Sequence, residues 1–141
     1  MSQKGIVFTT KLSLAECANL FQQTGNSLRG IRGRLLEAGA MVAGHGDRTG
    51  FYTPTFDSPF SRIEGVPDFA VGVNILKFNA GAQGNGTHVH MYVDDRGEHR
   101  DVQIVAKHGL LDASRSGRMV RKFFEAFQGS DAGVTVTEGN I

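Results

Sequence analysis

The 141-residue sequence has no tryptophan and only one cysteine, Cys17, so no disulfide can form within the chain. It also lacks a long apolar run, because no stretch approaches the roughly 20 apolar residues needed to span a bilayer. The first residues, Met1 to Gly5, carry one positive charge without a following apolar segment, which argues against a signal peptide. We therefore expect a cytoplasmic protein that makes no membrane contact.

The sequence also lacks an excess of positive or negative charge. The 15 basic residues balance 14 acidic ones, so the formal net charge is +1 and nothing in this total suggests a polyanion partner. A hydrophobic fraction of 40% and a charged fraction of 21% are ordinary for a globular domain. The length and composition of the chain predict one domain. We place it over residues 1–130, followed by a C-terminal tail over residues 131–141.

The N-terminal part of the sequence predicts one strand and two helices. Residues 5–11 are rich in β-branched and aromatic side chains, which favours a strand. Ser13 stands three residues before Glu16, the spacing of a capping box at a helix start. Gly25 is a natural helix terminator, and a weaker apolar period over residues 27–38 predicts a second helix.

The remainder predicts an antiparallel meander from about residue 40 to 108, followed by an amphipathic helix. Pro54 marks its first clear strand as an edge strand. The proline-containing loop that follows is expected to pack on the core through Phe60 and Ile63. In the final helix the apolar face is rich in phenylalanine. The expected strands cover residues 51–56, 69–79, 87–94 and 99–107, and the helix covers residues 114–128.

The fold class expected from this order is α+β. An antiparallel meander of about five to six strands should carry an N-terminal helix pair and a C-terminal amphipathic helix, packed on one face. The order of elements is similar to the helix-grip arrangement of START and Bet v 1-like ligand-binding domains. That resemblance implies a groove between sheet and helices that holds an apolar ligand.

The strand over residues 87–94 carries the most distinctive polar pattern. Its alternation places His88, His90, Tyr92 and Asp94 on one face. Two imidazoles and a carboxylate can bind a divalent transition metal, which makes His88, His90 and Asp94 candidate ligands. The glycine-rich segment before His88 also resembles the first metal motif of cupins. The alternative is an ordinary strand that carries two histidines and binds no cofactor.

A second pattern is the basic Gly-x-x-Gly segment between the two expected N-terminal helices. It resembles the loop by which KH domains clamp a nucleic-acid backbone. The resemblance implies close backbone approach at the glycines and phosphate contacts from the arginines. The alternative is a glycine-kinked helix with an exposed basic face. The residues concerned are Arg29, Gly30, Arg32, Gly33 and Arg34.

A basic stripe follows the C-terminal helix, on the side opposite its apolar face. It is either the solvated side of a docked helix or a surface for an acidic partner. Its residues are Arg115, Arg118, Arg121 and Lys122.

The sequence contains no nucleophile elbow, P-loop or dinucleotide fingerprint, so a non-enzymatic protein is expected. The function that fits best is a binding or assembly module. It would contact a partner protein, a second copy through an exposed edge at 51–56, or a small apolar ligand. Metal binding, with or without catalysis, and nucleic-acid binding are the alternatives.

Overall fold

A computed structural model of the chain describes residues 3–42, 51–56, 60, 66–76, 86–107 and 113–141. Within them, the elements follow the order β1 (Gln3–Thr10), α1 (Leu14–Val42), β2 (Phe51–Tyr52), β3 (Phe69–Leu76), β4 (Gly86–Asp95), β5 (Arg100–Lys107), α2 (Ala113–Ser130) and β6 (Thr135–Asn140).

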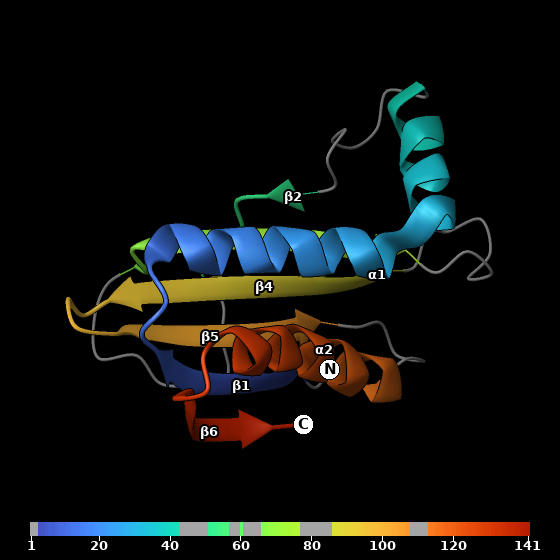
Figure 1. Cartoon of the computed structure of the whole chain (residues 1–141). Coiled ribbons are helices and arrows are strands. Elements are labelled where there is room, and N and C mark those ends of the chain that lie inside the picture. Colours follow the sequence, from blue (N-terminus) through green and yellow to red (C-terminus); the bar gives the residue numbers. More distant parts are fainter. Residues whose placement is uncertain (1–2, 43–50, 57–59, 61–65, 77–85, 108–112) are drawn as a thin grey trace.

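The strands form one six-stranded antiparallel sheet in the order β2-β3-β4-β5-β1-β6. Both helices lie on the same face of this sheet, α1 over the β3–β4 side and α2 over β1 and β5 (Figure 1). The expected α+β architecture is therefore confirmed. We call the opposite face, turned away from α1 and α2, the far face. None of the helices in the described part of the chain is long and apolar enough to cross a membrane.

The main core lies between the helices and the sheet. Val89, Met91 and Val93 of β4 point to the helices, as the alternation predicts, and each is fully buried. Phenylalanine rings fill the space above them: Phe21 of α1 stacks on Phe123 of α2, with ring centroids 4.6 Å apart. The capping box is also confirmed, because the Ser13 hydroxyl accepts from the Glu16 N–H and the Glu16 carboxylate from the Ser13 N–H.

The expected N-terminal helix pair is instead one helix of 29 residues, which turns sharply in its second half (Figure 1). Gly25 does not end it. A Cβ at this position would lie 3.0 Å from the Phe51 ring and 3.6 Å from a Val73 methyl group. Gly25 therefore lets α1 pass close over β2 and β3, a packing role that the glycine of a helix terminus would not have.

Both edges of the sheet differ from expectation. The strand expected over residues 51–56 covers only Phe51–Tyr52, because Pro54 cannot donate to a ladder. The expected tail contains β6, which pairs with β1, and Asp131 fixes the turn before it by accepting from the Thr10 hydroxyl at 2.7 Å. A register shift makes Thr137 a bulged residue. Short and bulged edge strands discourage pairing between chains. Self-association through the edge at 51–56 remains a prediction.

Candidate functional site on the far face

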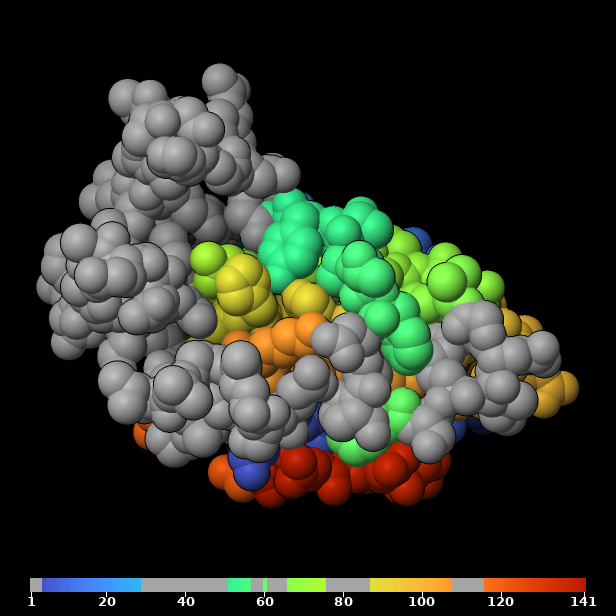
Figure 2. All heavy atoms as spheres, turned by 180° about the vertical axis from the view of Figure 1, so that it is seen from behind, coloured from blue at the N-terminus to red at the C-terminus, as the bar shows by residue number. Residues whose placement is uncertain are grey.

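Most of the polar face of β4 is buried, whereas His88 is exposed. His90 and Asp94 are each 7% exposed and Tyr92 is 1% exposed. Figure 2 shows the reason: residues 51–56, in green, lie across the yellow and orange atoms of β4 and β5. A buried row of imidazole, phenol and carboxylate groups must find hydrogen-bond partners within the fold, since burying such groups unpaired is costly.

Aromatic side chains from the covering segment form a second, smaller core on this face. Phe60 is buried with Tyr92 and Val105, as the sequence predicts for the loop, whereas Ile63 lies outside the described residues. Gly5 of β1 makes room for Phe60, because a Cβ there would stand 2.6 Å from the ring. Phe56 contacts Tyr92 edge to face, with ring centroids 4.8 Å apart.

A chain of hydrogen bonds runs along the buried polar face. The Tyr52 hydroxyl lies 2.8 Å from Nδ1 of His88 and 2.7 Å from Nε2 of His90. Nδ1 of His90 lies 2.8 Å from the Tyr92 hydroxyl, which donates to the Thr55 carbonyl at 3.3 Å. The Tyr52 and His90 side chains meet because of the cross-strand register. Tyr52, Gly72 and His90 lie in one row across β2, β3 and β4.

The end of this chain sets the direction of its protons. With the single Tyr92 proton donated to the Thr55 carbonyl, the Tyr92 oxygen accepts from Nδ1–H of His90. Nε2 of His90 then accepts from the Tyr52 hydroxyl. The Tyr52 oxygen in turn accepts from Nδ1–H of His88. His88 keeps an exposed edge, and its Nε2 is the acceptor at the open end of the chain.

Gly72 leaves room for the Tyr52 ring between the two histidines, because it has no side chain. A Cβ on Gly72 would lie 2.8 Å from two atoms of this ring and 2.9 Å from Cδ2 of His90. Partial burial, with a smaller contribution from Tyr92, raises the pKa of Tyr52 to about 12. Partial burial, and secondly the charge of Lys107 on the neighbouring strand, lowers the pKa of His88. Both groups are thus neutral at neutral pH.

Next to this chain lies an open hollow of about 470 Å³, between residues 53–56 and 66–70. Most of the lining that the structure describes is apolar, and Asp68 is the one charged residue in that part. Val66 stands at the hollow with 79% of its surface exposed, the highest value among the large hydrophobic residues described. The described residues of the lining are Thr53, Pro54, Thr55, Phe56, Val66, Pro67, Asp68, Phe69 and Ala70.

The third predicted metal ligand, Asp94, lies apart from the two histidines. Asp94 lies four positions beyond His90 along the strand, or about 13 Å at roughly 3.3 Å per position. Asp94 lies 3.9 Å from Arg96, which also donates to Asp101 at 3.0 Å. Among the described residues, no three His, Cys, Asp or Glu side chains converge to hold an ion. The structure thus brings His88 and His90 together but not with Asp94.

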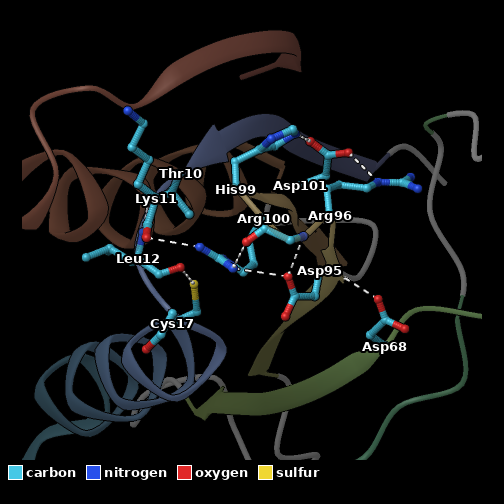
Figure 3. Close-up of polar contacts among 12 residues, drawn as sticks. Thr10, Lys11, Leu12, Cys17, Asp68, Asp95, Arg96, His99, Arg100 and Asp101 are labelled. Atoms are coloured by element: carbon cyan, nitrogen blue, oxygen red, sulfur yellow. Dashed lines mark hydrogen bonds and ion pairs between the residues drawn. The ribbon is translucent and has the colours of Figure 1, made fainter.

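A polar cluster lies at the β4–β5 hairpin (Figure 3), and Asp94 adjoins it through Arg96. Arg100 donates to Asp95 at 3.0 Å and to the Lys11 carbonyl at 3.1 Å, which joins this hairpin to the end of β1. Asp68 accepts from the Asp95 N–H at 2.8 Å. The Gly97 N–H, and secondly Arg100, lower the pKa of Asp95. Because its charged groups are paired with one another, this cluster fixes the hairpin.

The basic Gly-x-x-Gly segment lies inside α1 and not in a loop between two helices. Backbone N–H groups in the interior of a helix are bonded to the preceding turn, so they cannot clamp a phosphate as the resemblance implied. The side chains of Arg29, Arg32 and Arg34 lie outside the described residues, and a nucleic-acid role for them remains a prediction.

The basic stripe of α2 occupies the solvent side of that helix, where Arg118, Arg121 and Lys122 are exposed. The side chain of Arg115 is outside the described residues. The structure supports the predicted placement of this stripe, and its role as a partner surface remains a prediction.

Two residues of the site, Tyr52 and Tyr92, were not among the residues selected from the sequence. The alternation of β4 gives a signal for Tyr92, which shares a face with both histidines. Tyr52 has no local signal, because its position depends on the pairing of β2 with a strand that starts 17 residues later. Comparisons with protein families, with curated proteins and with solved structures found no match to this chain.

Proposed function

We propose that the protein is a binding module for a small, mostly apolar molecule, held in the hollow between residues 53–56 and 66–70. The observation that carries this proposal is the exposed Val66 beside a concave, largely apolar lining. A volume of about 470 Å³ falls in the range of small-molecule sites, which combine apolar walls with few polar groups.

The polar groups of the lining define the ligand further. Among the described residues of the lining, Asp68 is the only charged one. An uncharged molecule with one hydrogen-bond donor finds acceptors in Asp68, Thr53 and Thr55. One wall is rigid, because the Thr55 carbonyl accepts from Tyr92 and Phe56 packs on the Tyr92 ring. A preorganised wall lowers the ordering cost of binding.

The experiment uses the uncharged fluorescent probe N-phenyl-1-naphthylamine, titrated into the full chain. Val66→Asp should weaken probe binding about tenfold, because burying a valine side chain contributes about 1.5 kcal/mol and 1.4 kcal/mol corresponds to a factor of ten. The matched control is Val136→Asp on β6, where an exposed valine lies on a different part of the surface. Equal affinity of the two variants and the unmodified chain would contradict the proposal.

A further inference from the structure

We propose that Tyr52, acting through His90 and Tyr92, positions one wall of the apolar hollow and thereby sets the affinity for its ligand. The inference rests on the proposed function, because it concerns the same hollow. Tyr52 is not among the residues that line the hollow, whereas Thr55 and Phe56 are. The observation that carries the inference is the unbroken series of hydrogen bonds from the Tyr52 hydroxyl to the Thr55 carbonyl.

The two walls of the hollow are anchored differently. Ala70 belongs to β3 and pairs with Tyr92 of β4, so its wall is part of the sheet ladder. The opposite wall, residues 53–56, follows β2, whose two residues are its whole pairing with β3. Because residues 53–56 have no ladder of their own, their position depends on contacts with side chains from the sheet.

The Tyr92 side chain connects the two walls. The Tyr92 backbone pairs with Ala70 in one wall, and the Tyr92 hydroxyl donates to the Thr55 carbonyl in the other at 3.3 Å. The Tyr92 ring also meets Phe56 edge to face, with ring centroids 4.8 Å apart. Tyr92 is only 1% exposed, so its ring is confined by the surrounding core. The position of the 53–56 wall therefore depends on whether the Tyr92 hydroxyl holds Thr55.

The tautomer of His90 decides where the Tyr92 proton goes. A neutral imidazole carries its proton on only one of its two ring nitrogens. The Tyr52 hydroxyl donates to Nε2 of His90 at 2.7 Å, which leaves the His90 proton on Nδ1. This Nδ1–H donates to the Tyr92 oxygen at 2.8 Å, and the Tyr92 proton is then free for the Thr55 carbonyl. In the other tautomer, Nδ1 accepts from Tyr92 and Thr55 loses its donor.

Tyr52 is thus a positioning residue, and its effect on the ligand must be reciprocal. Without the Tyr52 hydroxyl, His90 can populate both tautomers, and only one of them holds the wall. A ligand that prefers the ordered wall then has to return His90 to the Nδ1–H form, which costs affinity. By linkage, the same ligand shifts the His90 tautomer by the factor that the tautomer shifts its affinity.

The test titrates the uncharged probe N-phenyl-1-naphthylamine into the full chain and three variants. Tyr92→Phe removes the donor to Thr55 and should weaken binding about threefold to tenfold, the factor that one hydrogen bond contributes. Tyr52→Phe should weaken binding at least about twofold, because His90 is then shared between two tautomers. The matched control, Thr10→Val, removes a hydroxyl hydrogen bond on β1, towards the other edge of the sheet, and should leave the affinity unchanged.

A spectroscopic signature distinguishes positioning of the wall from a general loss of stability. Long-range proton–nitrogen spectra should show the His90 proton on Nδ1 in the unmodified chain and shared between both nitrogens in Tyr52→Phe. Saturating Tyr52→Phe with the probe should return this proton to Nδ1. Even without the probe, Tyr52→Phe should shift the amide signal of Phe56, whose peptide group contains the Thr55 carbonyl. Thr10→Val should change neither signal.

Equal affinity of Tyr52→Phe, Tyr92→Phe and the unmodified chain would overturn the inference, as would a His90 tautomer that the probe does not shift in Tyr52→Phe. A loss in Thr10→Val as large as that in Tyr52→Phe would assign the effect to stability and refute it too. A His90 proton on Nε2 in the unmodified chain would refute it without any variant. If the unmodified chain binds no probe, the proposed function fails, and the ligand-free Phe56 signal still decides whether Tyr52 positions the wall.

Discussion

Replacing Gly72 by alanine tests whether the Tyr52 hydroxyl is held between His88 and His90. A Cβ at Gly72 would lie 2.8 Å from two atoms of the Tyr52 ring and 2.9 Å from His90. The ring must therefore move, and its bonds of 2.8 and 2.7 Å to the histidines break. Two hydrogen bonds at about 0.5–1.5 kcal/mol each give an expected loss of about 1–3 kcal/mol in the free energy of unfolding.

Urea unfolding followed by far-ultraviolet circular dichroism measures this loss. The near-ultraviolet signal reports the site directly, because the chain has no tryptophan and only two tyrosines, Tyr52 and Tyr92. Gly117→Ala makes the same chemical change in α2, where an added Cβ meets nothing within 4 Å. It should stabilise the protein by about 0.5–1 kcal/mol, since alanine is the better helix former.

A double-mutant cycle shows where the cost arises. In a Tyr52→Ala background, the effect of Gly72→Ala should shrink, because two of the three closest atoms belong to the Tyr52 ring. If Gly72→Ala leaves both the stability and the near-ultraviolet spectrum unchanged, Tyr52 does not lie over Gly72 and the reasoning fails.

Burial raises the pKa of the Cys17 thiol to about 11. Ellman's reagent should therefore modify Cys17 in the native protein at least about 100-fold more slowly than in the urea-unfolded chain. Equal rates would place Cys17 at the surface. The Lys11 N–H, followed by the Thr10 hydroxyl, lowers the pKa of Asp131. A lowered carboxyl pKa stabilises the fold above the unfolded value near 3.9 and loses this effect as the pH falls. Asp131→Asn should therefore cost about 1 kcal/mol at neutral pH and progressively less below about pH 4, as urea midpoints across this range would show. Phe8, fully buried against Phe124 and Phe127, should lose about 3–5 kcal/mol of unfolding free energy on replacement by alanine; a loss below 1 kcal/mol in urea would contradict its core position.

The sequence was sufficient for the architecture because its signals are local. The capping box at Ser13, the alternation around Met91 and the phenylalanine period of α2 each predicted an element that the structure contains. The prediction that Gly25 ends the first helix was wrong, because a glycine inside a helix and a glycine that ends one look alike in sequence. Only the packing of Phe51 against Gly25 distinguishes them.

The site was only half predictable. His88 and His90 share a strand face, so alternation was enough to pair them. The burial of Tyr92 beside them depends on Phe56 and Phe60, which come from a segment whose prolines indicate only a loop. Tyr52 reaches the histidines through the register of β2 with β3 and of β3 with β4. Such non-local pairing is not encoded in any short pattern, which is why Asp94 was the expected third ligand.

The protonation of the two histidines tests the far-face site most directly. Long-range proton–nitrogen correlation spectra distinguish the imidazole tautomers, with His88→Asn and His99→Asn used for assignment. With Tyr92 donating to Thr55, the hydrogen-bond chain predicts that His88 and His90 each carry a proton on Nδ1 and that Nε2 of His90 carries none. A His90 protonated on Nε2 alone would contradict the chain, because Nε2 could then not accept from Tyr52.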